Sequence, residues 1–187
     1  PIGPAYIAAV GRDAGHEVRV VDGSGSAPRN FFHFKDILVR GLSSDEIVKR
    51  IPKDTQVIGL GCMFTSNWVY VRELLKDIRK EFPKTFMVLG GEHGTGFPEF
   101  SLEQSPLDAV VMGEGEETII ELLSYLGKGL PLDNLSGVAF RDSNGKIRVN
   151  PRRNRITDID SLPWPAWEFF DIEGYNDVSA VFRSTAE

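Results

Sequence analysis

Glycine-containing segments that follow apolar runs carry the residues of this sequence that are best suited to contact a ligand. Residues 86–89 are apolar and stop on Gly90 and Gly91, which an acid and a histidine follow. Because one glycine is enough for a turn, two of them after a buried strand indicate backbone that comes close to a group that is not protein. The candidate contacts in this and two similar segments are Gly61, Cys62, Met63, Thr65, Ser66, Gly90, Gly91, Glu92, His93, Gly113, Glu114 and Gly115.

His93 and Cys62 are predicted to be structural rather than chemically active. His93 has no cysteine or histidine partner at metal-ligand spacing, which favours a hydrogen-bonding residue of a loop over a metal ligand. Nothing near Cys62 suggests an activating base, so we predict a small apolar filler at a strand end. We therefore expect neither a catalytic residue nor a metal ligand in this chain, and we place His16 and His33 on the surface.

The acids after Gly113 are typical of the start of a helix. Glu116 and Glu117 precede a periodic apolar stretch, where carboxylates stabilise the positive end of the helix dipole. Glu114 lies between two glycines, and for this reason it keeps a role in ligand contact.

The composition is that of a globular protein without a basic surface. The 187 residues are 41% hydrophobic and 26% charged, with a formal net charge of −6. Disorder and nucleic-acid binding through bulk charge are therefore not expected. Cys62 is the only cysteine, which excludes an intrachain disulfide and favours a reducing, cytoplasmic setting. No apolar run approaches the ~20 residues that span a bilayer.

Alternating helical patterns and apolar runs predict an α/β fold. The expected helices cover residues 3–14, 43–51, 68–82 and 116–126, and the expected strands cover 18–21, 55–63, 85–91 and 107–112. Strands that are apolar throughout indicate a parallel sheet with helices on both faces, in a doubly wound, flavodoxin-like or Rossmann-like arrangement. The glycine-bearing loops at 59–61, 90–91 and 113–115 then lie at the carboxyl ends of strands, where such folds bind ligands.

The C-terminal part is predicted to extend this domain. Residues 138–149 form a β-hairpin around an Asn144-Gly145 turn, and an extended linker rich in proline follows, with Trp164 and Trp167 packed. The expected divisions are 1–132 for the α/β domain, 133–156 for the hairpin, and 157–187 for the linker and the start of a truncated second domain. The first strand of the sheet is expected to be missing, and a further strand is expected within 177–187.

The order of several segments resembles a known family. The segments PIGPAYIAAVGRDAGHEVRVVD, IGLGCMFTSN, VLGGEHGTGFPE, DAVVMGEGEETIIELL and DIDSLPWPAWEFFD resemble the cobalamin-binding domain of cobalamin-dependent radical S-adenosylmethionine (SAM) enzymes, similar to the anaerobic magnesium-protoporphyrin IX monomethyl ester cyclase type. The resemblance covers the chain from Pro1 to about Phe182, and GEGEET and LPWPAW are its most specific parts.

The family's binding motif is matched in spacing but not in every residue. Cobalamin-binding folds carry Ser-x-Leu at one strand end and Gly-Gly at the next. Here Gly61-Cys62-Met63 takes the first place, and the 26 residues 64–89 separate it from Gly90-Gly91. Thr65 or Ser66 is expected to replace the missing serine hydroxyl. Enzymes of this type commonly lack a cobalt-ligating histidine, so cobalt is expected to have no protein axial ligand.

The resemblance implies cobalamin as cofactor and partner. The corrin would lie across the strand ends, and the nucleotide tail would pass Gly90 and Gly91, whose N–H groups can hold its phosphate. It also implies a parent methyltransferase or cyclase whose radical SAM domain holds a [4Fe-4S] cluster and SAM. With one cysteine, this chain alone is not expected to be catalytic.

Other classes of function remain open at this point. A flavodoxin-like interaction or regulatory domain that has lost its cofactor would explain the altered Ser-x-Leu position. A flavin- or nucleotide-binding domain would use the same crevice at the strand ends. However, Gly-x-Gly-x-x-Gly does not follow the first strand, and no P-loop motif is present.

Overall fold

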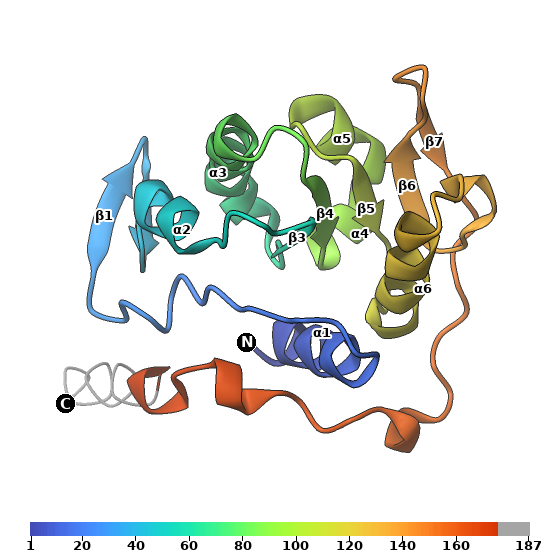
Figure 1. Cartoon of the computed structure of the whole chain (residues 1–187). Coiled ribbons are helices and arrows are strands. Elements are labelled where there is room, and N and C mark those ends of the chain that lie inside the picture. Colours follow the sequence, from blue (N-terminus) through green and yellow to red (C-terminus); the bar gives the residue numbers. More distant parts are fainter. Residues whose placement is uncertain (176–187) are drawn as a thin grey trace.

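The computed structural model describes residues 1–175, which form a mixed five-stranded sheet with helices on both faces (Figure 1). Strands β3 (Val57–Gly61), β4 (Phe86–Gly90) and β5 (Ala109–Val111) are parallel, and β6 (Val138–Arg141) and β7 (Ile147–Val149) continue the sheet in antiparallel fashion. The strand order is β3-β4-β5-β6-β7. The strand predicted within 177–187 lies outside the described residues.

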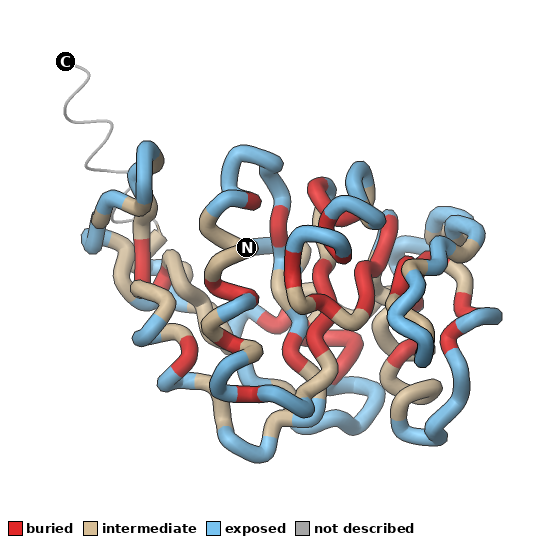
Figure 2. Tube along the Cα trace, turned by 90° about the horizontal axis from the view of Figure 1, so that it is seen from above, coloured by how far each residue is buried: buried red, intermediate tan, exposed pale blue. Residues whose placement is uncertain are grey.

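The alternation of side chains along the strands builds a core on each face of the sheet. Met87 and Leu89 of β4 point to the face covered by α3 (Trp68–Glu81) and α5 (Pro98–Gln104), whereas Val88 packs on the opposite side with α6 (Glu116–Gly127). Helix α1 (Ile2–Asp13) lies on the α6 side, as Figure 1 shows. In Figure 2 the buried residues gather in the middle of the molecule and the exposed ones lie mainly around its outside.

The sequence signals for the helices are confirmed. Helix α2 (Ser44–Arg50) starts with a full capping box, in which Ser43 accepts a hydrogen bond from the Glu46 N–H and the Glu46 carboxylate accepts one from the Ser43 N–H. Gly15 stops α1 with a φ of +87°. Gly145 turns the predicted hairpin with a φ of +75°, and His16 and His33 are exposed.

The predicted strand at 18–21 is wrong. Residues 16–22 adopt no regular structure, because their backbone has no neighbouring strand to pair with among residues 1–175. Val18 and Val20 instead pack beside Ala8 and Ala9 of α1. Apolar β-branched residues favour a strand only where a hydrogen-bonding partner lies alongside.

Three other features differ from the sequence-based expectations. Gly59 and Gly61 lie inside β3 rather than in a loop, and Gly90 is the last residue of β4. The glycine-rich stretch after Gly91 forms two short helices, α4 (Glu92–Gly96) and α5. The pair β1 (Phe31–Phe34) and β2 (Ile37–Arg40) forms a separate hairpin that the sequence patterns did not reveal.

The linker after β7 follows the outside of α1. The Ala166 N–H donates a hydrogen bond to the carbonyl oxygen of Ala5 at 3.0 Å, and Ala166 is fully buried. Trp164 was expected to be packed, but its exposed fraction is 87%. The small Ala166, and not an indole ring, fills the contact with α1.

We expect the core around α3 to dominate stability. Leu75→Ala removes a fully buried side chain and should lower the free energy of unfolding by about 2–5 kcal/mol. In urea denaturation, the control Val69→Ala on the exposed side of the same helix should cost less than about 1 kcal/mol. Equal losses for the two variants would contradict the assigned core.

The capping box of α2 should make stability depend on pH. The hydrogen bonds from Ser43 hold the pKa of Glu46 below its ordinary value. The advantage of the wild type over Glu46→Ala is therefore fully present above the ordinary glutamate pKa and is lost as the pH falls through the lowered pKa. Urea denaturation between pH 7 and pH 3 measures this difference, and a constant difference would refute the assignment.

Candidate functional site

The predicted contact residues meet at the carboxyl edge of the parallel strands. The Cys62 N–H after β3 donates to the Gly90 carbonyl at 2.9 Å, and the His93 N–H in α4 donates to the Cys62 carbonyl at 3.1 Å. The Gly113 N–H after β5 donates to the Thr95 hydroxyl at 2.9 Å. Two backbone hydrogen bonds and one bond to the Thr95 hydroxyl therefore join the three segments, although 52 positions separate residue 61 from residue 113.

The two adjacent glycines have different structural roles. Gly91 has a φ of +95°, and a Cβ on it would lie 2.6 Å from the carbonyl oxygen of Cys62. The backbone that approaches Gly91 is therefore protein, which corrects the expectation of a non-protein neighbour at this position. A Cβ on Gly90 would meet no atom within 4 Å. In the direction that a side chain would take, the space is therefore open at Gly90 and closed by protein at Gly91.

Gly90 belongs to a strip of the sheet that carries no side chains. Gly61 pairs with Gly90 in register, and Gly59 pairs with Val88. Because Val88 packs on the α6 side, the alternation places all three glycines on that face. Gly59 and Gly61 are exposed, and a Cβ on Gly61 would reach only ordinary contact with Pro4 of α1, at 3.8 Å. The strip can admit a flat or narrow group beside α1.

Exposed apolar side chains accompany the strip at the same edge. Met63 and Phe64 follow β3 and are 55% and 65% exposed, and Phe97 after α4 is 51% exposed. Sequence reasoning included Met63 but missed Phe97, because an isolated aromatic residue carries no positional signal. Ser66, which was also selected, is exposed in the short turn that leads into α3, and Glu92 is exposed at the start of α4.

His93 is buried inside the site rather than exposed in a loop. It lies in α4 with 1% of its surface exposed, and its Nδ1 is 3.2 Å from the hydroxyl of Thr65. Its ring stacks on the Trp68 ring with a distance of 4.6 Å between the ring centroids. The centroid of the Phe97 ring lies 5.6 Å from that of His93. Burial lowers the pKa of His93, which favours the neutral ring near pH 7. The predicted hydrogen-bonding role is confirmed, and its partner is the β3–α3 segment.

Cys62 is an inert buried thiol. Its side chain is 1% exposed and donates weakly to the Phe64 carbonyl at 3.5 Å. Burial raises its pKa to about 11, so the nucleophilic thiolate is disfavoured. The prediction of an apolar filler is confirmed. Within residues 1–175, no group of three or more histidine, cysteine or acidic residues is arranged to hold a metal ion.

The loop between β5 and α6 is fixed by neighbours on both sides. Gly115 is the N-cap residue directly before α6, and a Cβ on it would lie 3.1 Å from Ile7 of α1. Gly113 has a φ of +78° with open space around it. The Glu114 carboxylate accepts a hydrogen bond from the Ile156 N–H at 2.6 Å. Glu116 and Glu117 occupy the first turn of α6, as predicted.

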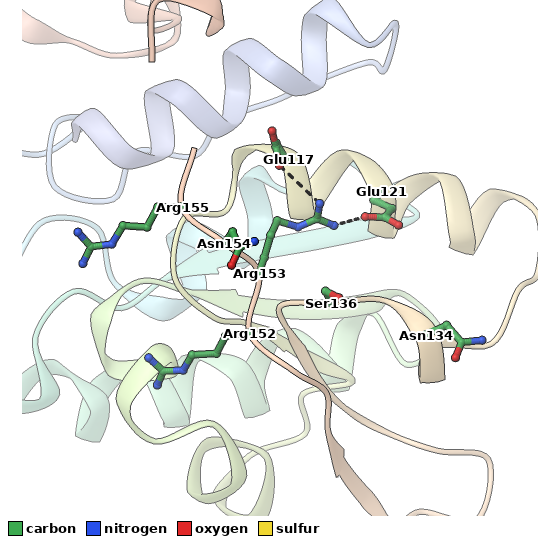
Figure 3. A pocket seen from close by; sticks show the side chains of 8 residues that line it. All are labelled: Glu117, Glu121, Asn134, Ser136, Arg152, Arg153, Asn154 and Arg155. Atoms are coloured by element: carbon green, nitrogen blue, oxygen red, sulfur yellow. Dashed lines mark hydrogen bonds and ion pairs between the residues drawn. The ribbon is translucent and has the colours of Figure 1, made fainter. Parts of the chain in front are cut away.

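A second, polar hollow lies beside this loop. It measures about 410 Å³ and is lined by α6 and by the segment after β7 (Figure 3), with Glu117, Glu121, Asn134, Ser136, Arg152, Arg153, Asn154 and Arg155 around it. Arg153 points to α6 and pairs with Glu117 and Glu121. Sequence reasoning did not select these residues, since only the fold brings residues 152–155 to α6.

No helix among residues 1–175 is long and apolar enough to span a bilayer.

Two curated relatives resemble this chain over most of its length. The chain is 30% identical to cytidylyl-2-hydroxyethylphosphonate methyltransferase of Streptomyces wedmorensis, with 96% of this chain and 38% of the relative covered. It is 31% identical to the anaerobic magnesium-protoporphyrin IX monomethyl ester cyclase of Rubrivivax gelatinosus, with 76% and 26% covered. The chain thus spans well under half the length of these relatives.

A solved structure with the same fold is that of the cobalamin-dependent SAM radical enzyme OxsB with aqua-cobalamin and SAM bound. The TM-score is 0.72 at 20% identity, and the match covers 96% of this chain and 22% of that one. This likeness confirms the predicted α/β, Rossmann-like fold class. The model of the B12 binding domain matches residues 1–123, which include every predicted contact residue. The chain therefore belongs to the B12-binding domain family.

Proposed function

We propose that the chain holds cobalamin with the nucleotide tail along the glycine strip and the corrin across the carboxyl edge of β3, β4 and β5. The observation that carries this placement is the uncovered backbone at Gly59, Gly61 and Gly90, where added Cβ atoms would meet at most ordinary contacts. A long, narrow group fits such a strip, and backbone N–H groups at its end can hold a phosphate.

The predicted contact residues have different roles in this proposal. Gly61, Gly90 and Gly113 leave the space open, while Met63 with Phe64 and Phe97 offers apolar surface to the flat face of a macrocycle. Cys62, Thr65, Gly91, His93 and Gly115 hold the surrounding backbone in place. Ser66 and Glu92 are exposed on the rim and are available for polar contacts, whereas the carboxylate of Glu114 already accepts a hydrogen bond from the Ile156 N–H.

His93 supports the site without binding cobalt. Its Nδ1 is engaged by Thr65, and its Nε2 is buried without a partner among the described residues. A ring held between Trp68 and Phe97 cannot turn outward unless it loses both contacts. Bound cobalamin supplies a cobalt centre for methyl or redox chemistry, and the residues of this chain contribute binding, orientation and exclusion of water.

The parent protein is proposed to be a radical SAM methyltransferase or cyclase in the cytoplasm. The relatives are much longer than this chain, and their names describe a methyltransferase and a cyclase. A single cysteine cannot hold a [4Fe-4S] cluster, so the cluster and SAM belong to a radical SAM domain elsewhere in the parent chain.

Titration with hydroxocobalamin, followed by gel filtration and a visible spectrum, tests the placement. The wild type should co-elute with near one cobalamin per chain, and Gly90→Leu should weaken binding at least about tenfold because its side chain fills the strip. The control Gly127→Leu also enters open space, but at the far end of α6, and it should bind like the wild type.

Either of two results would contradict this placement. A colourless wild type would favour the interaction domain that has lost its cofactor. Equal binding by Gly90→Leu and the wild type would show that the nucleotide tail does not lie along the strip.

The two adjacent glycines should respond differently to alanine. Gly91→Ala forces a side chain into a positive φ and against the Cys62 carbonyl, and it should destabilise the fold by about 1–3 kcal/mol. Gly90→Ala meets no atom and should be tolerated in urea denaturation. Similar losses of stability in both variants would show that Gly90 is also closed by protein.

A further inference from the structure

The segment after β7 attaches to the same edge that carries the proposed cofactor site. Residue Asn150 is fixed by two hydrogen bonds from its amide to the carbonyl oxygens of Leu132 and Leu135, at 2.7 and 2.8 Å. The Gly137 N–H donates to the Pro151 carbonyl at 2.8 Å, which anchors the chain where β6 begins. The five residues that follow, 152–156, then cross the carboxyl edge of the parallel strands.

This segment, which we name the strap (residues 152–156), contacts successive elements of the site. The guanidinium of Arg152 donates to the Thr95 carbonyl in α4 at 3.1 Å. Thr95 is also the residue whose hydroxyl accepts the Gly113 N–H. The strap therefore connects to α4 and, through Thr95, to the β5–α6 loop.

Arg153 fixes the strap to α6. Glu117 and Glu121 are four residues apart and lie on the same face of the helix, and Arg153 pairs with both carboxylates (Figure 3). Without the guanidinium, two like charges would face each other at this spacing. The side chain of Arg153 is 24% exposed, so water screens this pairing only in part.

Glu114 connects the β5–α6 loop to the end of the strap. Its carboxylate accepts the Ile156 N–H at 2.6 Å, a distance typical of a charge-assisted hydrogen bond. Gly113 and Gly115 flank it, so the loop has little stiffness of its own. The contact to Ile156 gives the loop a fixed partner that comes from 42 residues further along the chain.

We infer that the strap is a wall of the cofactor site and that Glu114 is a positioning residue, which acts by holding the β5–α6 loop in the conformation that binds cobalamin. This inference rests on the proposed function. Attachment of the strap and binding of the cofactor then favour each other, because a coupling between two equilibria works in both directions. Bound cobalamin should stabilise the attached conformation of the strap, and an intact strap should raise the affinity for cobalamin.

The test uses hydroxocobalamin as the probe and compares four variants with the wild type. Glu114→Ala removes the acceptor for Ile156, and Glu114→Gln restores a neutral one. Arg153→Met breaks the attachment to α6 and keeps the aliphatic stem of the side chain. Glu103→Ala is the matched control, since Glu103 is an exposed carboxylate of α5 on the opposite face of the sheet.

Two quantities are measured for each protein. The dissociation constant comes from the visible spectrum during titration, and hydrogen exchange followed by mass spectrometry reports on peptides that cover residues 150–158. We expect about fivefold weaker binding for both Glu114→Ala and Arg153→Met, at the lower end of typical couplings. We also expect Glu114→Gln to recover most of the affinity and cobalamin to slow exchange in the wild-type strap.

The outcomes separate the inference from the proposed function. If Glu114→Ala weakens binding while Arg153→Met binds like the wild type, Glu114 acts by direct contact and the strap has no role. If cobalamin leaves exchange in residues 150–158 unchanged, the coupling is absent and the inference fails. A wild type that does not bind hydroxocobalamin would instead overturn the proposed function itself.

Discussion

The arrangement of the site depends on the backbone of Cys62, which joins β3 to the segment after β4. Its N–H donates to Gly90 and its carbonyl accepts from His93, so one residue fixes both ends of the turn that contains Gly91. This short connection is possible only because Gly91 has no Cβ. The uncovered strip, the buried imidazole and the start of α4 all take their positions from this contact.

The site combines rigid backbone with an absence of side chains. Gly91 and Gly115 are glycines because protein atoms press on them, whereas Gly90 is open. In the proposed mode of binding, cobalamin would be recognised by the shape of a sheet edge, to which apolar side chains such as Phe64 and Phe97 add exposed surface. The buried thiol and the neutral imidazole add packing, and neither adds a reactive group.

Much of the fold and the general position of the site follow from local signals in the sequence. The capping box at Ser43, the amphipathic stretch 68–81 and the Asn144-Gly145 turn each specify an element within a few residues. Signals of this kind could not reveal that residues 18–21 lack a strand partner within the described residues 1–175, because pairing is a property of distant chain segments. For the same reason, the contacts of Arg152 and Arg153 with α4 and α6 had no counterpart in any motif.

Helix α1 has a consequence for how this protein can vary. Its Ala5, Ala8 and Ala9 lie against the linker that carries Ala166, and its Ile7 lies against Gly115 at the head of α6. Alanine combines the highest helix propensity with the smallest chiral side chain. Side chains of α1 that face the linker can therefore be no larger than a methyl group. Substitution by larger residues would push the linker away from the domain. A substitution in α1 can thus preserve the helix itself and still be selected against, because it disturbs the spacing between α1 and the linker.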